Sequence, residues 1–185
     1  SETPRIVVNV GGFTQDAPLA IENRSGRYEI VADSLGRLDL SGIAVLPQTM
    51  PPYPWHFGGQ RYQNLFVDPW EIAAFCREHD VGVCLDTSHS KLACNLYRWS
   101  FSDFLQVVGP YTSHLHIADA SGVDGEGLQV KDGEIDFTAI HSLEEAVRAI
   151  LGQPTLSTQH RSEALHLRAM ARIHLGNSDD AIDDL

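Results

Sequence analysis

The sequence predicts an α/β fold made of β-α units with parallel strands. Over residues 1–150, short apolar runs rich in β-branched residues alternate with helical patterns, which is the order that parallel crossover connections produce. Four of these runs are predicted to be buried strands, and polar clusters follow several of them. Four parallel strands form either half of a barrel or a small open sheet, and the pattern alone leaves both architectures open.

The first part of the pattern contains two predicted strands and a weak helix. The run 5–10 is β-branched and ends on Gly11, and the run 42–46 ends at Pro47. Both are predicted to be buried strands. Residues 28–38 are weakly helical and connect them.

Capping signals predict two further helices. Asp68 can cap a helix that begins at Pro69, because proline suits the first helical position, and Glu71 completes a capping box. Ser100 is predicted to cap a second helix, which Gly109 ends.

Two more strands are predicted at residues 81–85 and 113–118, and an acid follows each of them. Asp86 comes directly after the first of these strands and Asp119 after the second. In parallel α/β folds, ligands bind beyond the carboxyl ends of the strands. A binding or catalytic site is therefore expected at these positions.

Residues 151–185 differ from the rest and are predicted to form a separate helical hairpin after the domain at 1–150. Two helices are expected around residues 175–177, with small and apolar packing positions. This segment resembles one tetratricopeptide unit, which would bind a protein partner. A plain terminal hairpin is the alternative.

Charge and composition exclude several classes of protein. The 185 residues include 25 acidic and 13 basic side chains, a formal net charge of −12. Because a phosphate backbone repels such a field, a nucleic-acid partner is not expected. No apolar run approaches the roughly 18 residues of a membrane span, so no membrane partner is expected. Three cysteines are too few for a disulfide framework, which favours a reducing, cytoplasmic setting.

The sharpest polar cluster follows the strand at 81–85. Asp86 and His89 leave the strand end together, and Lys91 adds a cation. Oxygen and nitrogen ligands of this type suit Zn²⁺, Mn²⁺ or similar ions. In the alternative interpretation, Asp86 caps the next helix and His89 is an ordinary loop residue.

A second cluster lies on the strand at 113–118 and after it. Alternation places His114 and His116 on one face of the strand, and Asp119 follows. Asp124 and Glu126 lie in a glycine-spaced loop, where either carboxylate can bind a metal ion. For each acid alone, a solvated turn is the default interpretation.

The long segment 48–64 is predicted to contact substrate. Prolines stiffen it, and aromatic and hydrogen-bonding side chains crowd together in it; loops of this length are usually functional or disordered. Arg61 can hold a carboxylate or phosphate with two parallel hydrogen bonds, and Trp55 offers a flat face to a sugar or base. A structured lid that packs on its own aromatic rings is the alternative.

Taken in order, these segments resemble the xylose-isomerase-like TIM barrels, a superfamily that includes sugar phosphate isomerases and epimerases and class II AP endonucleases. The run from Asp86 to His89 is similar to the family's Asp-x-x-His metal pair, and the run from His116 to Asp119 is similar to its His-x-x-Asp strand. Residues 132–137 are similar to its glycine-rich turn. The resemblance covers residues 5 to about 140 and implies the second half of a (β/α) barrel.

Within the superfamily, residues 116–127 and 54–59 look most like barrel domains attached to N-acetylneuraminate-synthase-type proteins. The resemblance implies isomerisation or epimerisation of a sugar or sugar phosphate. In that chemistry a divalent metal ion (Zn²⁺, Mn²⁺ or Co²⁺) polarises the carbonyl and hydroxyl while a carboxylate or histidine moves a carbon-bound proton.

The resemblance also implies roles for individual residues, with some departures from the family. The expected metal ligands are Gln48, Asp86, His116 and Glu126; the expected proton-transfer groups are His89 and Glu126; the expected substrate contacts are Trp55, His56, Gln60, Arg61 and Lys91. Gln48 stands where the family places a metal-binding glutamate, so a neutral group replaces an acid. No candidate supplies the glutamate of the family's last strand.

A second class of function stays open beside the enzyme. In it the chain is a binding or scaffold module, a barrel remnant without chemistry joined to the tetratricopeptide-like hairpin. For either class, the open edges of a half barrel favour self-association.

Overall fold

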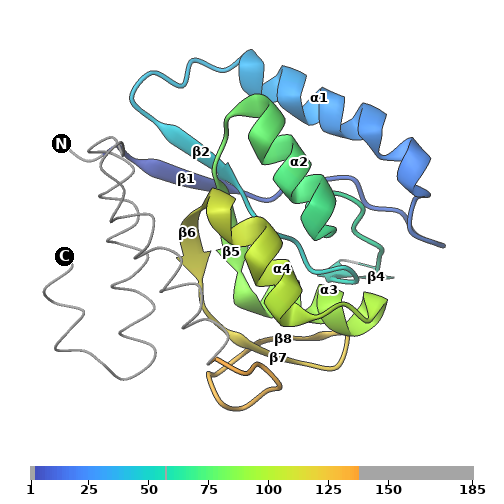
Figure 1. Cartoon of the computed structure of the whole chain (residues 1–185). Helices are drawn as coiled ribbons and strands as arrows, with labels where there is room; N and C mark the ends of the chain where they lie inside the picture. The colour runs from blue at the N-terminus through green and yellow to red at the C-terminus, as the bar shows by residue number, and fades with distance from the viewer. Residues whose placement is uncertain (1–2, 57, 138–185) are drawn as a thin grey trace, which may run out of the picture.

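The computed structural model describes residues 3–56 and 58–137. Within these residues, four strands run parallel in the order β1 (Arg5–Val8), β2 (Ala44–Pro47), β5 (Val83–Asp86) and β6 (Thr112–His116). Ladders join β1 to β2 and β5 to β6, and a parallel bridge between Gln48 and Cys84 joins the two pairs. The predicted α/β fold with parallel strands is therefore confirmed (Figure 1).

Helices connect these strands. The helical elements are η1 (Ile21–Asn23), α1 (Ser25–Gly36), α2 (Pro69–His79), α3 (Thr87–Tyr97), α4 (Phe101–Val108) and η2 (Gly109–Tyr111). Helices α2 and α4 pack side by side over the sheet (Figure 1). Strand β5 is buried along its whole length, because helices cover one of its faces and neighbouring strands flank both of its edges.

The predicted helix starts are confirmed, but one detail is wrong. Asp68 Oδ1 accepts hydrogen bonds from the backbone N–H of Trp70 at 2.9 Å and of Glu71 at 3.3 Å. The Glu71 side chain, however, does not complete a capping box: its Oε1 lies 3.3 Å from Arg24 Nη1. Pairing with a cation at the start of α1 replaces the local contact, and it ties α1 to α2.

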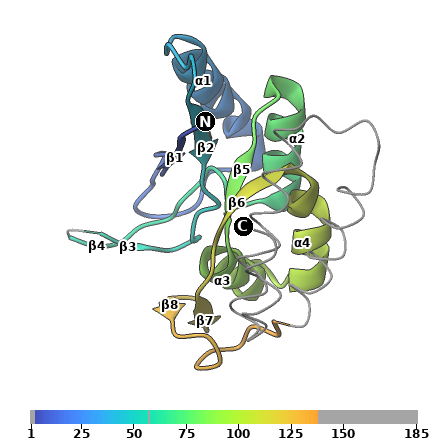
Figure 2. The same cartoon turned by 90° about the vertical axis from the view of Figure 1, so that its left-hand side faces the viewer.

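Two antiparallel hairpins follow parallel strands where the sequence suggested loops. Strands β3 (Trp55–His56) and β4 (Gly59–Gln60) form one, and strands β7 (Asp119–Ser121) and β8 (Gly125–Leu128) form the other. Figure 2 shows β3–β4 reaching away from the sheet, while β7–β8 packs below α3. The second hairpin is the one that positions the site described next.

Several predictions concern residues outside this part of the chain. The predicted helical hairpin at 151–185, with its tetratricopeptide-like pattern, lies outside the described residues. Among the helices that are described, none has both the length and the apolar character needed to cross a bilayer.

Candidate functional site

Three neighbouring parallel strands bring polar side chains to one end of the sheet. Gln48 follows β2 and bridges to Cys84, while Asp86 and His116 lie opposite each other at the ends of β5 and β6. Because parallel strands end at the same edge, these side chains converge there although they come from distant parts of the sequence.

Asp86 is a buried carboxylate with both oxygens in use. Its Oδ1 accepts the backbone N–H of His89 at 3.0 Å, which caps α3. Its Oδ2 accepts a hydrogen bond from Gln48 Nε2 at 2.9 Å and lies 3.7 Å from His116 Nδ1. The helix-capping interpretation of Asp86 is therefore confirmed, and the cap also presents one oxygen to the site.

His89 is a buried helical residue, so the alternative that made it an ordinary loop residue is wrong. It lies in the first turn of α3 and is 7% exposed. Its Nδ1 is 2.8 Å from the carbonyl oxygen of Thr49, and its Nε2 is 2.8 Å from Glu126 Oε1. A carbonyl and a carboxylate only accept hydrogen bonds, so both ring nitrogens of His89 donate.

The charge on His89 follows from these contacts. Burial alone lowers the pKa of the imidazole, but the hydrogen bond to Glu126 and the charges of Asp86 and Glu126 outweigh burial, so the pKa is raised above its ordinary value. The raised pKa favours the protonated ring, which would form a charge-assisted hydrogen bond with the Glu126 carboxylate.

Glu126 is the solvent-facing member of this pair. Its side chain is 45% exposed, against 9% for the side chain of His89. The backbone N–H of Gly127 donates to Ser88 Oγ at 2.9 Å, and this bond holds β8 against the first turn of α3. A substrate at the strand ends can therefore reach the carboxylate while the imidazole stays behind it.

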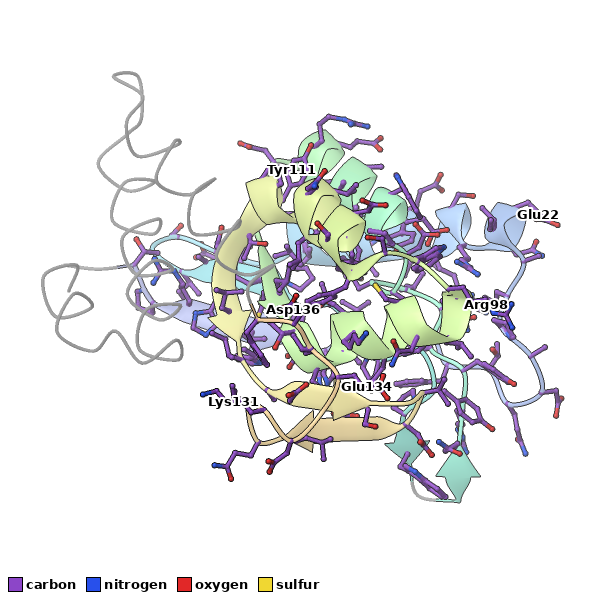
Figure 3. All side chains as sticks on the ribbon, turned by 60° about the horizontal axis from the view of Figure 1, so that its bottom comes forward. Glu22, Arg98, Tyr111, Lys131, Glu134 and Asp136 are labelled. Carbon is purple, nitrogen blue, oxygen red and sulfur yellow. The ribbon has the colours of Figure 1, made fainter. Side chains whose placement is uncertain are left out.

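Glu134 anchors the hairpin that carries Glu126. It lies between α3 and the β7–β8 hairpin (Figure 3) and accepts hydrogen bonds from Gly122 N at 3.1 Å, Ser121 Oγ at 3.1 Å and Asn95 Nδ2 at 2.9 Å. These bonds, with that from Gly122 first, hold the pKa of Glu134 below its usual range. Glu134 and Asn95 carry no local signal of their contact in the sequence, because they lie 39 residues apart.

Asp119, the acid after β6, serves the fold and not the site. It is fully buried, and its carboxylate accepts the backbone N–H groups of four residues, at distances between 2.8 and 3.0 Å, namely Ala120, Lys131, Gly133 and Ile135. The glycine-rich turn is thereby fixed beneath β6. A Cβ at Gly133 would collide with this carboxylate, which explains the glycine.

The predicted metal ligands do not fit a divalent ion in this arrangement. Asp86 Oδ2 and His116 Nδ1, 3.7 Å apart, are near enough to share an ion. Gln48, however, turns its amide N–H and not its oxygen toward Asp86, and Glu126 is engaged by His89. Within the described residues, no group of three or more His, Cys, Asp or Glu side chains is placed to hold a metal. The metal site stays a prediction without support from these contacts.

The predicted substrate contacts are not all brought together. Trp55 and Arg61 are exposed on and beside the β3–β4 hairpin, with Trp55 69% exposed. The hairpin also packs on its own aromatics, since the rings of Tyr53 and Tyr62 are 4.7 Å apart, and Gln60 Nε2 donates to a carbonyl within the same segment. The side chain of His56 lies outside the described part of the structure.

Lys91 lies apart from the other predicted contacts. It is two residues beyond His89 on α3, which places it on the opposite side of the helix. It shares a face with Asn95, four residues further on, and therefore points toward the hairpin anchor and not toward the acid–base pair.

Parallel strands joined by helices, with an acid–base cluster at their carboxyl ends, define a TIM-barrel-like α/β domain. The chain belongs to the xylose isomerase-like TIM barrel family, whose family model matches residues 4–146. This confirms the resemblance at the level of the family.

One solved structure supports the fold. The chain is similar to the crystal structure of a D-tagatose 3-epimerase-like protein, with a TM-score of 0.58 and 17% sequence identity, over 97% of this chain and 64% of that chain. The chain thus spans 64% of the length of that protein. No match to a curated protein was found.

Proposed function

We propose that this chain carries the proton-transfer site of an enzyme that isomerises or epimerises a sugar or sugar phosphate. The observation that carries the proposal is the hydrogen bond of 2.8 Å between His89 Nε2 and Glu126 Oε1 at the carboxyl ends of the parallel strands. Membership of the xylose isomerase-like family supports it.

In this proposal the half-exposed Glu126 carboxylate acts as the base. It takes a proton from the carbon next to the substrate carbonyl, and the electron pair of that C–H bond becomes part of an enediolate. Returning the proton from Glu126 to the neighbouring carbon, while the proton of the substrate hydroxyl moves to the former carbonyl oxygen, completes an isomerisation. An epimerisation instead needs a second acid that gives a proton to the opposite face of the same carbon. General-base catalysis of this kind typically contributes 10²–10⁴-fold.

His89 supports the carboxylate from behind. Its imidazolium orients Glu126, and its positive charge stabilises the negative charge that develops on the enediolate. Two contacts hold His89 in place. Its backbone N–H donates to Asp86 Oδ1, and its Nδ1 contacts the Thr49 carbonyl. The exposed Trp55 and Arg61 and the half-buried Gln60, with His56 in the same segment, are proposed to hold the polyhydroxy or anionic end of the substrate.

Exchange of substrate hydrogen with solvent tests this proposal. The protein is incubated in D₂O with a panel of ketoses, aldoses, their phosphates and sugar acids, and deuterium at the carbon next to the carbonyl is followed by NMR. We expect incorporation with at least one compound and a loss of about 10²-fold or more in Glu126→Gln, but not in Glu78→Gln, a change at an exposed helix position. No incorporation with any compound, or equal rates in parent and Glu126→Gln, contradicts the proposal.

A further inference from the structure

We propose that the carboxyl ends of these strands do not hold a divalent metal ion, because N–H groups of Gln48 and His89 occupy the oxygen atoms that such an ion would need. In this arrangement the Gln48 amide and the His89 backbone N–H donate hydrogen bonds to Asp86, and Glu126 is the partner of the His89 ring. The mechanistic use of this arrangement rests on the proposed function, but the arrangement itself follows from contacts among the described residues.

The first argument concerns the nitrogens of His89. Each faces an acceptor at 2.8 Å, the Thr49 carbonyl on one side and the Glu126 carboxylate on the other. A metal ligand needs a ring nitrogen with a free lone pair, and this ring offers none without breaking one of these bonds. His89 therefore acts as a hydrogen-bond donor between two acceptors and not as a metal ligand.

The second argument concerns Gln48. Its Nε2 is 2.9 Å from Asp86 Oδ2, so the amide must present N–H groups to the carboxylate. Both oxygens of Asp86 are then satisfied by N–H donors, one from Gln48 and one from the His89 backbone. A divalent ion at Oδ2 would have to displace the amide and turn its oxygen inward, at the cost of a buried hydrogen bond.

The third argument concerns the number of available ligands. Asp86 Oδ2 and His116 Nδ1, 3.7 Å apart, are near enough to share an ion. Gln48 and Glu126, the two further predicted ligands, are engaged in hydrogen bonds to Asp86 and His89. Within the described residues, no group of three or more His, Cys, Asp or Glu side chains is placed to hold a metal ion.

A titration with Mn²⁺ tests this proposal without a substrate. The full chain is stripped with EDTA, dialysed, and titrated with MnCl₂ by calorimetry and by electron paramagnetic resonance, beside Gln48→Glu and a matched control, Gln106→Glu, at an exposed position of α4. We expect the parent and Gln106→Glu to bind Mn²⁺ only in the millimolar range. Gln48→Glu adds a carboxylate beside Asp86 and should bind one Mn²⁺ at least tenfold more tightly.

Two results overturn the proposal. One is a parent that binds one Mn²⁺ in the micromolar range and loses that binding in Asp86→Asn. The other is a Gln48→Glu protein, folded by circular dichroism, that binds Mn²⁺ no better than Gln106→Glu. If Gln48→Glu fails to fold, the titration of the parent decides.

The same preparation separates this proposal from the proposed function. Deuterium exchange that survives EDTA treatment supports a site without a divalent ion, whereas exchange that EDTA abolishes and Mn²⁺ restores overturns it. An absence of exchange with and without Mn²⁺ contradicts the proposed function alone. The titration then still decides whether the site holds a divalent ion.

Discussion

At the scale of single residues, the two acids that follow buried strands have different roles. Asp86 and Asp119 both follow buried strands, and the sequence gives them equal standing. One oxygen of Asp86 accepts a hydrogen bond from Gln48 and faces the site. Both oxygens of Asp119, in contrast, accept hydrogen bonds from four backbone N–H groups. The partners of Asp119 lie up to 16 residues along the chain, so no local pattern distinguishes a buried anchor from a ligand.

Replacing Asp119 should destabilise the protein without touching the acid–base pair. In Asp119→Asn, one oxygen becomes an N–H₂ group that faces backbone donors of Lys131 and Gly133. Leaving these partly buried donors unsatisfied should lower the free energy of unfolding by about 1 kcal/mol, measured by urea denaturation. Asp33→Asn, at an exposed position of α1, is the matched control and should change stability little. Equal stability of the two variants contradicts the anchoring role.

The same contacts predict how stability depends on pH. Burial raises the pKa of Asp119, but the N–H groups of Ile135, Ala120 and the turn outweigh burial and hold the pKa below its usual range. A pKa that is lower in the folded state contributes stability above the unfolded value of about 3.9. That contribution is lost as the pH falls through the folded pKa. The stability difference between parent and Asp119→Asn should therefore shrink below about pH 4, and a difference that stays constant down to pH 2 would rule this out.

At the scale of elements, the sequence predicts features that depend on neighbouring residues and misses those that depend on contacts between distant residues. Helix α2 begins where the sequence predicts, because Asp68 and Pro69 act within one turn. The pairing of His89 with Glu126 spans 37 residues, and it depends on how β7–β8 folds back on α3. Sequence reasoning could name both residues as candidates, but it could not pair them, and it mistook the hairpin for a loop.

Loosening the β7–β8 hairpin should slow catalysis while keeping every acid and base in place. Asn95 Nδ2 donates to the Gly122 carbonyl at 2.6 Å and to Glu134 at 2.9 Å. In Asn95→Ala, Glu126 loses part of its support, and we expect deuterium exchange to fall several-fold with little change in the substrate concentration that gives half the maximal rate. Asn95→Asp, which keeps the size but cannot donate, should behave like Asn95→Ala; an exchange rate at the parental level in both variants would show that the anchor is irrelevant to catalysis.

At the scale of the whole molecule, the parallel sheet leaves an apolar strand at its edge. In the described part of the chain, β1 pairs with β2 alone, and Ile6 of β1 is 46% exposed. An exposed parallel edge favours pairing with another copy. The half barrel and self-association both stay predictions. Both concern the edge of the sheet that β1 forms.

Association through this edge can be measured directly. Light scattering coupled to size-exclusion chromatography should show a mass that rises with protein concentration. Ile6→Lys places a charge on the edge and should reduce that rise, whereas Ile30→Lys, at a more exposed position on α1, should not. A monodisperse monomer at all concentrations would remove the reason to treat β1 as an open edge.

The central claim is that His89 is held as a cation by Glu126, and NMR of the histidine ring nitrogens tests it most directly. In protein labelled with ¹⁵N at histidine and held at pH 7, the account predicts that both ring nitrogens of His89 carry protons. In Glu126→Gln the carboxylate is lost, and His89 should shift toward a neutral ring with one protonated nitrogen, while Glu78→Gln should match the parent. A neutral His89 in the parent, with the same pattern in Glu126→Gln, would contradict the account.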